Sequence, residues 1–253
     1  MKSNGMATAG YEWITLDDCY AMRRDNATGE LFPDPALFPN GFDRVVAAAH
    51  AANFKFGIYT SAGNYTCHAK KENCSGTCNV GSLGHYEQDA ATFARWQLDY
   101  VKMDWCGDNK TLDSQGRSEG HLNFSKALNQ TGRHMAFELC RGPYQKMDHW
   151  VRSADALSLC LLVMTDALSW PQGYADAVAQ VWRAASDHHD SFSHTLEQLA
   201  AIKGKNAWSR PYGWAYSTNL STRCQGRRYA ATTADADASI TRVQCVYLCM
   251  QWT

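Results

Sequence analysis

Segments with the composition of β-strands alternate with segments patterned as α-helices. Residues 11–16, 54–60, 100–104 and 134–140 are rich in aromatic and β-branched side chains, which favour strands. Between them, residues 42–53, 85–97 and 122–129 are patterned as helices. Strands that are joined through helices run parallel, so the sequence predicts an α/β protein, either a doubly wound sheet or a (β/α)8 barrel.

Polar residues gather where the expected strands end. Asp17, Asp18, Tyr59, Asp104 and Arg141 all occupy such positions. Barrel enzymes carry their chemistry at the carboxyl ends of their strands. A Gly-x-Gly-x-x-Gly sequence does not follow the first strand, which disfavours a nucleotide-binding sheet. We therefore expect a TIM-type barrel, and 253 residues suffice for a single catalytic domain over 1–253.

Charge and composition narrow the class of partner. A formal net charge of -1 provides no basic surface for nucleic acid or for an anionic membrane, and no apolar run is long enough to span a bilayer. Ten cysteines together with several Asn-x-Ser/Thr sequons predict a secreted or a lysosomal or vacuolar protein. Because the amino terminus has no signal peptide, we expect an additional segment before it. The oligomeric state is not predicted.

Two aspartates are candidates for glycoside hydrolysis, which needs one carboxyl group on each side of the anomeric carbon. Asp104 ends a strand, and Lys102 points to the same face, where a cation favours the ionised carboxylate. Asp187 follows Arg183 by four residues. Each aspartate also has a structural interpretation: Asp104 as a turn or helix-capping residue, and Asp187 as half of a solvated helical ion pair.

Several sequence blocks resemble the α-galactosidase and α-N-acetylgalactosaminidase family, glycoside hydrolase family 27. They are YEWITLDDC at 11–19, DPALFPNG at 34–41, GIYTSAGNYTC at 57–67, GSLGHYEQDA at 81–90 and DYVKMDWC at 99–106. The blocks follow one another in the order of the family, and the resemblance returns at 182–190. It implies a barrel enzyme that cleaves terminal α-D-galactosides with retention, through a covalent glycosyl-aspartate intermediate and without a cofactor or metal. Its substrates would be α-galactoside oligosaccharides or glycoconjugates.

The resemblance also implies roles for single residues. It makes Asp104 the nucleophile and Asp187 the acid/base. Asp17 and Asp18 would accept hydrogen bonds from the 4-OH and 6-OH of the sugar, and Lys102 would donate to its 3-OH and 4-OH side. The remaining implied substrate contacts are Tyr59, Cys67, Arg141, Tyr144 and Arg183. Two implied disulfides join Cys67 to Cys106 and Cys74 to Cys78, although Cys74 and Cys78 could instead be half of a metal site.

The sequence departs from the family pattern at the end of the fourth strand. Residues 140–144 read CRGPY, where the family has Cys-Glu-Trp or Cys-Asn-Trp. These positions contact the substituent at C2 of the sugar in the family. The alternative activities are therefore α-N-acetylgalactosaminidase and β-L-arabinopyranosidase.

Other departures concern the completeness of the barrel. In the family, the first barrel strand and the partner of Cys19 precede the strand that begins at residue 11. Only ten residues stand there, so both are expected to be absent. Residues 157–178 read as an apolar insertion. Residues 242–252 resemble the last helix before the eighth strand, so the first and last strands and a C-terminal β-sandwich are expected to be missing. An open barrel would expose sheet edges and favour aggregation. A third interpretation is an inactive or sugar-binding remnant of the family.

Overall fold

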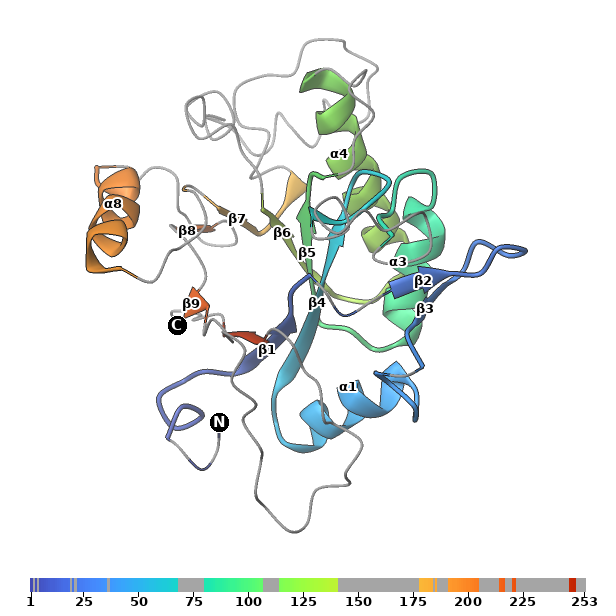
Figure 1. Cartoon of the computed structure of the whole chain (residues 1–253), viewed down its shortest axis with the longest axis horizontal. Helices are drawn as coiled ribbons and strands as arrows, with labels where there is room; N and C mark the ends of the chain where they lie inside the picture. The colour runs from blue at the N-terminus through green and yellow to red at the C-terminus, as the bar shows by residue number, and fades with distance from the viewer. Residues whose placement is uncertain are drawn as a thin grey trace. The chain divides into compact units, whose positions relative to one another are not determined.

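The computed structural model describes a defined part of the chain. The described residues are 1, 3, 5–18, 20, 22–35, 37–67, 80–106, 114–140, 178–183, 185, 191–204, 214–216, 220–221 and 246–248. They belong to two compact units, the first formed by residues 1–135 with 219–253 and the second by residues 136–218 (Figure 1). The two units are described separately.

Parallel strands form the centre of the first unit. Its strands β1 (Trp13–Leu16), β4 (Lys55–Ser61) and β5 (Tyr100–Asp104) are adjacent in that order. Thr15 pairs with Gly57, and Gly57 in turn pairs with Tyr100. Because the three strands are parallel, their carboxyl ends meet at one edge of the sheet.

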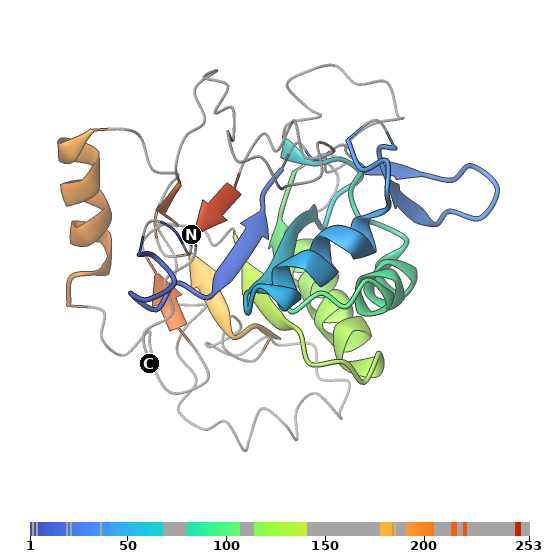
Figure 2. The same ribbon diagram turned by 90° about the horizontal axis from the view of Figure 1, so that it is seen from below.

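Helices that follow these strands in the chain pack along them (Figures 1 and 2). They are α1 (Phe42–Ala51), α3 (Tyr86–Arg95) and α4 (Ser114–Gln130). Phe42 of α1 is buried against Phe56 of β4, with ring centroids 5.8 Å apart. Phe93 of α3 contacts Phe124 of α4 at 6.2 Å. This βα succession confirms the predicted α/β class. The last of these helices begins earlier than the predicted start at residue 122.

A hairpin of β2 (Met22–Arg24) and β3 (Leu31–Pro33) follows β1. Its loop is closed by Asp25, whose Oδ1 accepts hydrogen bonds from the backbone N–H groups of Ala27 and Thr28. These hydrogen bonds lower the pKa of the exposed Asp25. Arg24 anchors the hairpin, because both of its terminal nitrogens reach the buried carboxylate of Asp89 in α3 at 2.8 and 2.9 Å.

The other edge of β1 is covered by an antiparallel strand. Strand β10 (Val246–Leu248) pairs with β1, and β9 (Leu220–Ser221) pairs with β10. The expectation of a helix over 242–252 is therefore wrong for residues 246–248. Val-Tyr-Leu is β-branched or aromatic at its first two positions, and the free edge of β1 offers it backbone hydrogen bonds.

The second unit also contains parallel strands. They are β6 (Ala136–Leu139), β7 (Val181–Arg183) and β8 (Trp214–Tyr216), adjacent in that order. Helix α8 (Phe192–Ile202) connects β7 to β8, and the Ser191 hydroxyl caps it by accepting from the His194 N–H. Among the described residues, no helix is long and apolar enough to cross a membrane.

Candidate active site

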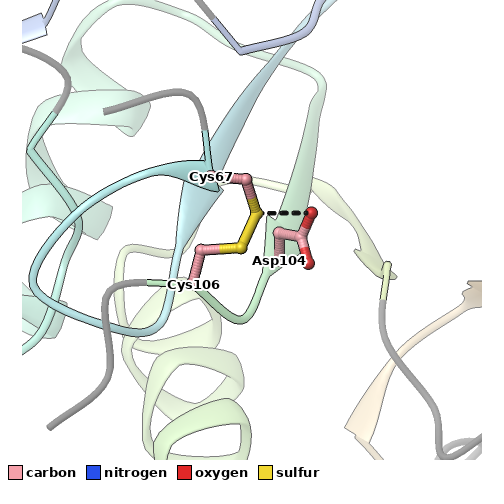
Figure 3. Close-up of side chains that lie close together, drawn as sticks. All are labelled: Cys67, Asp104 and Cys106. Carbon is pink, nitrogen blue, oxygen red and sulfur yellow. Dashed lines mark hydrogen bonds between the residues drawn. A yellow bond between two sulfur atoms is a disulfide. The ribbon is translucent and has the colours of Figure 1, made fainter. Parts of the chain in front are cut away.

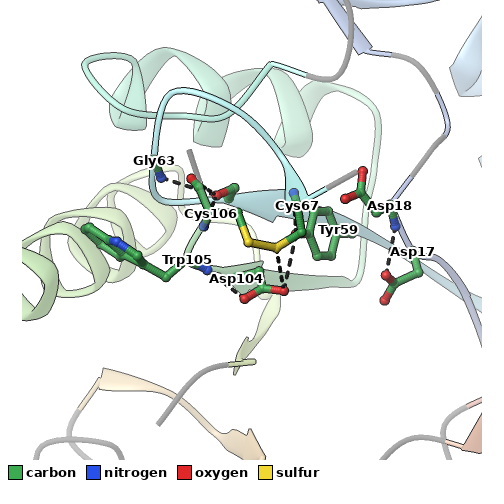
Figure 4. The surroundings of a disulfide bond; sticks show 9 residues. Asp17, Asp18, Tyr59, Gly63, Cys67, Asp104, Trp105 and Cys106 are labelled. Atoms are coloured by element: carbon green, nitrogen blue, oxygen red, sulfur yellow. Dashed lines mark hydrogen bonds between the residues drawn. A yellow bond between two sulfur atoms is a disulfide. The ribbon is translucent and has the colours of Figure 1, made fainter. Parts of the chain in front are cut away.

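The predicted site residues of the first unit lie at the carboxyl ends of its parallel strands. Asp17 and Asp18 directly follow β1, Tyr59 lies near the end of β4, and Lys102 and Asp104 lie on β5. The strand register sets Tyr59 opposite Lys102 and Ser61 opposite Asp104. In Figure 4, Tyr59 lies between the Asp17–Asp18 pair and a disulfide beside Asp104.

Lys102 and Asp17 form a buried ion pair across the sheet. The Lys102 Nζ lies 2.5 Å from the Asp17 Oδ2, and the two side chains are only 5% and 9% exposed. The ammonium also lies 5.5 Å from the centre of the Tyr59 ring. The second carboxylate oxygen of Asp17 accepts from the Asp18 N–H at 2.8 Å. This network fixes two charged groups that are chemically suited to bind sugar hydroxyls.

Asp104 is held by contacts to both of its carboxylate oxygens. Its Oδ1 accepts a hydrogen bond from the Trp105 N–H at 2.7 Å. Its Oδ2 lies 3.3 Å from the Tyr59 hydroxyl. The same oxygen lies 3.3 Å from the Cys67 Sγ (Figure 3). The sulfur of a disulfide has no proton to give, so the tyrosine hydroxyl is the donor here. The carboxylate is part-exposed and is therefore available to a substrate.

The predicted disulfide between Cys67 and Cys106 is present and lies beside Asp104 (Figures 3 and 4). Ser61 holds the Cys106 end, because its hydroxyl accepts from the Cys106 N–H and donates to the Cys106 carbonyl, both at 3.0 Å. At the other end, the Cys67 N–H reaches the Tyr59 hydroxyl at 3.4 Å. Side-chain and backbone contacts thus fix both cysteines as well as the bond between them.

The donor atoms of Cys67, Asp104 and Cys106 lie within 4.8 Å of one another. Such a group of two sulfurs and a carboxylate has the ligand types of a metal site. In this structure, however, the two sulfurs are bonded to each other, and thiolates are the form that binds metals.

Two partly buried tyrosines hold the backbone around the end of β4. The Tyr20 hydroxyl donates to the Tyr59 carbonyl at 2.6 Å, and burial raises the pKa of Tyr20, with Asp18 adding to the effect. The Tyr86 hydroxyl donates to the Ala62 carbonyl at 2.8 Å, and burial raises its pKa to about 12. Both tyrosines therefore act as neutral donors to the backbone around the end of β4.

His121 of α4 lies behind Trp105. The two rings meet edge to face, with centroids 5.4 Å apart, and the imidazole is fully buried. Within the described part of the chain, neither ring nitrogen has a hydrogen-bond partner. Burial lowers the pKa of His121 to about 4, against the opposing effect of the Asp104 charge.

Sequence reasoning missed several supporting residues. They are Tyr20, Arg24, Ser61, Tyr86, Asp89 and His121. Ser61 directly follows the predicted strand 54–60, and that position is the one signal that the sequence offered for it. In the structure Ser61 is the last residue of β4 and pairs with Asp104. The others act through contacts between distant segments, which residue spacing alone does not reveal.

The described residues include part of the predicted site. Arg183 ends β7 in the second unit and is buried. The other predicted residues, Asp187, Arg141, Tyr144, Cys74 and Cys78, lie outside the described residues, as do Cys19 and most of the 157–178 segment. Their predicted roles stay predictions.

Parallel strands alternating with helices, with carboxylates at the carboxyl ends of the strands, define the class of barrel-type α/β enzymes. A family model described as alpha galactosidase A (Melibiase_2) matches residues 1–223. The chain therefore belongs to this family of glycoside hydrolases.

Individual relatives agree with the family. The chain is 35% identical over 201 residues to a probable alpha-galactosidase of Dictyostelium discoideum, covering 79% of this chain and 42% of the relative. It is 30% identical over 216 residues to human alpha-galactosidase A, covering 83% of this chain and 44% of that protein. It thus spans less than half the length of these relatives.

Solved structures give the same result. An alpha-galactosidase from Saccharomyces cerevisiae with raffinose matches with a TM-score of 0.63 and 26% identity, over 85% of this chain and 45% of that one. An alpha-galactosidase/melibiase from Bacteroides fragilis matches with a TM-score of 0.65 and 26% identity, over 86% and 40%. The predicted family and TIM-type fold are confirmed, the barrel being partial over the span that this chain matches.

Proposed function

We propose that this chain carries the nucleophile of a retaining α-galactosidase, and that Asp104 is that nucleophile. The observation that carries the proposal is the position of Asp104 at the end of β5, with one oxygen held by the Trp105 N–H and the other beside the Tyr59 hydroxyl. Two donors hold the carboxylate in a fixed orientation at a part-exposed position. A nucleophile for the anomeric carbon needs both properties.

The proposed reaction has two steps. A carboxylate oxygen of Asp104 attacks the anomeric carbon, the glycosidic bond breaks, and the leaving oxygen takes a proton from Asp187. Asp187 then removes a proton from water, which attacks the same carbon and releases Asp104. Two inversions at one carbon leave its configuration unchanged. The site needs no cofactor, because carboxyl groups perform every proton and bond transfer.

Recognition of a galactosyl group rests on the Lys102–Asp17 pair. Their contact of 2.5 Å sets a donor and an acceptor side by side, and the Asp18 backbone N–H binds the second oxygen of Asp17. An axial 4-OH reaches such a pair differently from an equatorial one. A buried polar group that loses its partner costs free energy, so the wrong epimer is rejected. We propose α-galactoside oligosaccharides or glycoconjugates as substrates, which the raffinose-bound relative supports.

The disulfide bears on the cellular location. Disulfides persist in oxidising compartments, and Cys67–Cys106 lies within the proposed active site. We therefore propose a secreted or a lysosomal or vacuolar location.

Covalent labelling tests the nucleophile. The full chain is treated with a mechanism-based galactosyl fluoride or epoxide, digested and mapped by mass spectrometry, and we expect the label on Asp104. In parallel, NMR of the first-formed sugar should show retention of the anomeric configuration. Asp104→Asn should lower kcat/KM by about four orders of magnitude. Asp43→Asn, at an exposed position in the first turn of α1, is the matched control and should retain activity.

The opposing outcomes are distinct. A label on another carboxylate overturns the assignment of Asp104, and an inverted product overturns the retaining mechanism. Galactose binding without turnover of nitrophenyl α-galactoside would instead identify the chain as a sugar-binding member of the family. Faster turnover of the N-acetylgalactosaminide or β-L-arabinopyranoside would change the assigned sugar.

A further inference from the structure

We propose that reduction of the Cys67–Cys106 disulfide creates a binding site for a soft divalent cation, such as Zn²⁺ or Cd²⁺, formed by both thiolates and Asp104. The metal-binding claim is independent of the proposed function. Its consequence, that the bound cation inactivates Asp104, rests on the proposed function.

The geometry of the three donor groups is close to that of a metal site. A tetrahedral zinc with a sulfur and an oxygen ligand sets them about 3.6 Å apart, and two sulfurs about 3.8 Å apart. The Cys67 Sγ already lies 3.3 Å from the Asp104 Oδ2, and all three donor atoms lie within 4.8 Å of one another. Breaking the sulfur–sulfur bond lets side-chain rotation separate the sulfurs while the backbone stays in place.

Other contacts keep the ligands in place after reduction. Ser61 binds both the N–H and the carbonyl of Cys106, and the Tyr59 hydroxyl accepts from the Cys67 N–H. The Trp105 N–H holds the Asp104 Oδ1, which leaves Oδ2 to bind the cation. The Tyr59 hydroxyl lies 3.3 Å from that oxygen and can orient it as an outer hydrogen-bond donor. The site is thus organised before the metal arrives.

The ligand set determines the class of cation. Two thiolates select soft or borderline ions such as Zn²⁺ and Cd²⁺ over Mg²⁺ and Ca²⁺, which prefer oxygen ligands. Three protein ligands leave a fourth position for water. All three residues are part-exposed, so a reductant and a cation can both reach them.

The chemistry balances with a phosphine or a dithiol as the reductant. One S–S bond breaks, the disulfide gains two electrons and two protons, and a trialkylphosphine is oxidised to its oxide with oxygen from water. Cation binding then releases both thiol protons to solvent. The cation draws on a lone pair of Asp104 that the nucleophile would otherwise use on the sugar.

Alkylation mapping on the unmutated chain tests the site. The chain is reduced with a phosphine, desalted without oxygen, and treated with iodoacetamide in the presence or absence of Cd²⁺. We expect Cd²⁺ to slow alkylation of both Cys67 and Cys106 at least tenfold. In Asp104→Asn, the Cd²⁺ concentration needed for half-maximal protection should rise about tenfold. In Asp43→Asn, it should be unchanged. Equal alkylation rates with and without Cd²⁺ overturn the proposal.

A stoichiometry measurement guards against effects on folding. The number of Cd²⁺ ions bound per chain is titrated through the thiolate-to-cadmium ultraviolet band. The reduced Cys67→Ser/Cys106→Ser variant should bind one equivalent fewer than the reduced unmutated chain. The oxidised unmutated chain should also lack that equivalent. Unchanged stoichiometry in the variant also overturns the site. Activity is a separate readout: if Cd²⁺ protects both cysteines while neither form turns over galactoside, the metal site stands and the proposed function fails.

Discussion

The Lys102 ammonium and the Asp17 carboxylate meet at 2.5 Å, although Lys102 lies on β5 and Asp17 follows β1, two strands that are not adjacent in the sheet. Strand β4 lies between them, and the aromatic ring of Tyr59 on that strand lies below the ammonium. The two opposite charges pair with each other, and both side chains are largely shielded from water. The pair therefore links the outer strands of this group.

Removing one member of the pair should destabilise the first unit. Lys102→Met leaves the Asp17 carboxylate buried without its cation, which costs about 3–5 kcal/mol of unfolding free energy. Urea denaturation measures the loss. Lys126→Met, at an exposed position of α4, is the control and should stay within about 0.5 kcal/mol of the unmutated chain. A double variant, Lys102→Met with Asp17→Leu, should recover part of the loss. A single variant as stable as its parent would mean that the pair is not desolvated.

Two neighbouring arginines offer a matched comparison. Arg24 binds the fully buried carboxylate of Asp89 through two nitrogens, whereas Arg23 binds Asp34 with 45% of its side chain exposed. Arg24→Met should cost about 3–5 kcal/mol, and Arg23→Met less than about 1 kcal/mol. Thermal unfolding of the two variants at one pH compares them. Equal effects would contradict the assigned burial.

The loss of unfolding free energy in the Arg24→Met variant should depend on pH. Burial raises the pKa of Asp89, and the Arg24 guanidinium opposes that rise. Without the guanidinium, the folded-state pKa rises further above its unfolded value. Between the unfolded-state and folded-state pKa values of Asp89, the folded state then binds more protons than the unfolded state. The stability of the variant therefore falls as the pH rises through this range. The deficit should therefore shrink on acidification, because protonated Asp89 needs no cation.

Sequence patterns predicted the parallel strands and the disulfide well. Residues 54–60 and 100–104 contain several aromatic and β-branched side chains, so their composition and length sufficed to predict β4 and β5. Cys67 and Cys106 followed from the family resemblance. In contrast, the β10 strand depends on the free edge of β1, an opportunity created by tertiary structure.

The supporting contacts around the candidate site could not be predicted in this way. Arg24 and Asp89 are separated by 65 residues, and either alone reads as an ordinary surface charge. His121 falls in a helix of weak amphipathic pattern, so the sequence does not say which face is buried. Asp104, by contrast, was a candidate because a strand end and a lysine two residues earlier are local features, and its role was implied by the family resemblance.

Close backbone packing at Gly81 predicts a steric effect next to the disulfide-bearing loop. A Cβ atom at this position would lie 2.0 Å from the Gly63 carbonyl oxygen, which belongs to backbone and cannot rotate away. Gly81 also donates to the Asn64 carbonyl at 2.8 Å. Gly81→Ala should therefore cost more than about 3 kcal/mol, at or beyond the upper end of overpacking effects.

Gly84→Ala is the control for that substitution. Its added Cβ meets no atom within 4 Å, but its φ of +79° strains an alanine. That strain costs only about 1–2 kcal/mol. Denaturant melts of both variants give the comparison. A Gly81 variant that is as stable as the Gly84 variant would show that the loop can move away from Gly63.

Burial of His121 predicts a pH-dependent loss of stability in acid. Its folded-state pKa is about 4, below the unfolded reference of 6.5. Between these values the unfolded state binds more protons, so stability rises with pH, and it is lost as the pH falls from 6.5 to 4. The full contribution of this one group is about 3 kcal/mol.

His121→Phe keeps the packing against Trp105 and removes the proton site. It should therefore lose less stability over that window than the unmutated chain, as measured by urea denaturation at a series of pH values. Phe124→Leu, a buried change on the same helix, should lower stability at every pH and leave the slope of the unmutated chain intact. Parallel pH profiles for the His121 variant and the unmutated chain would refute a neutral imidazole behind Trp105.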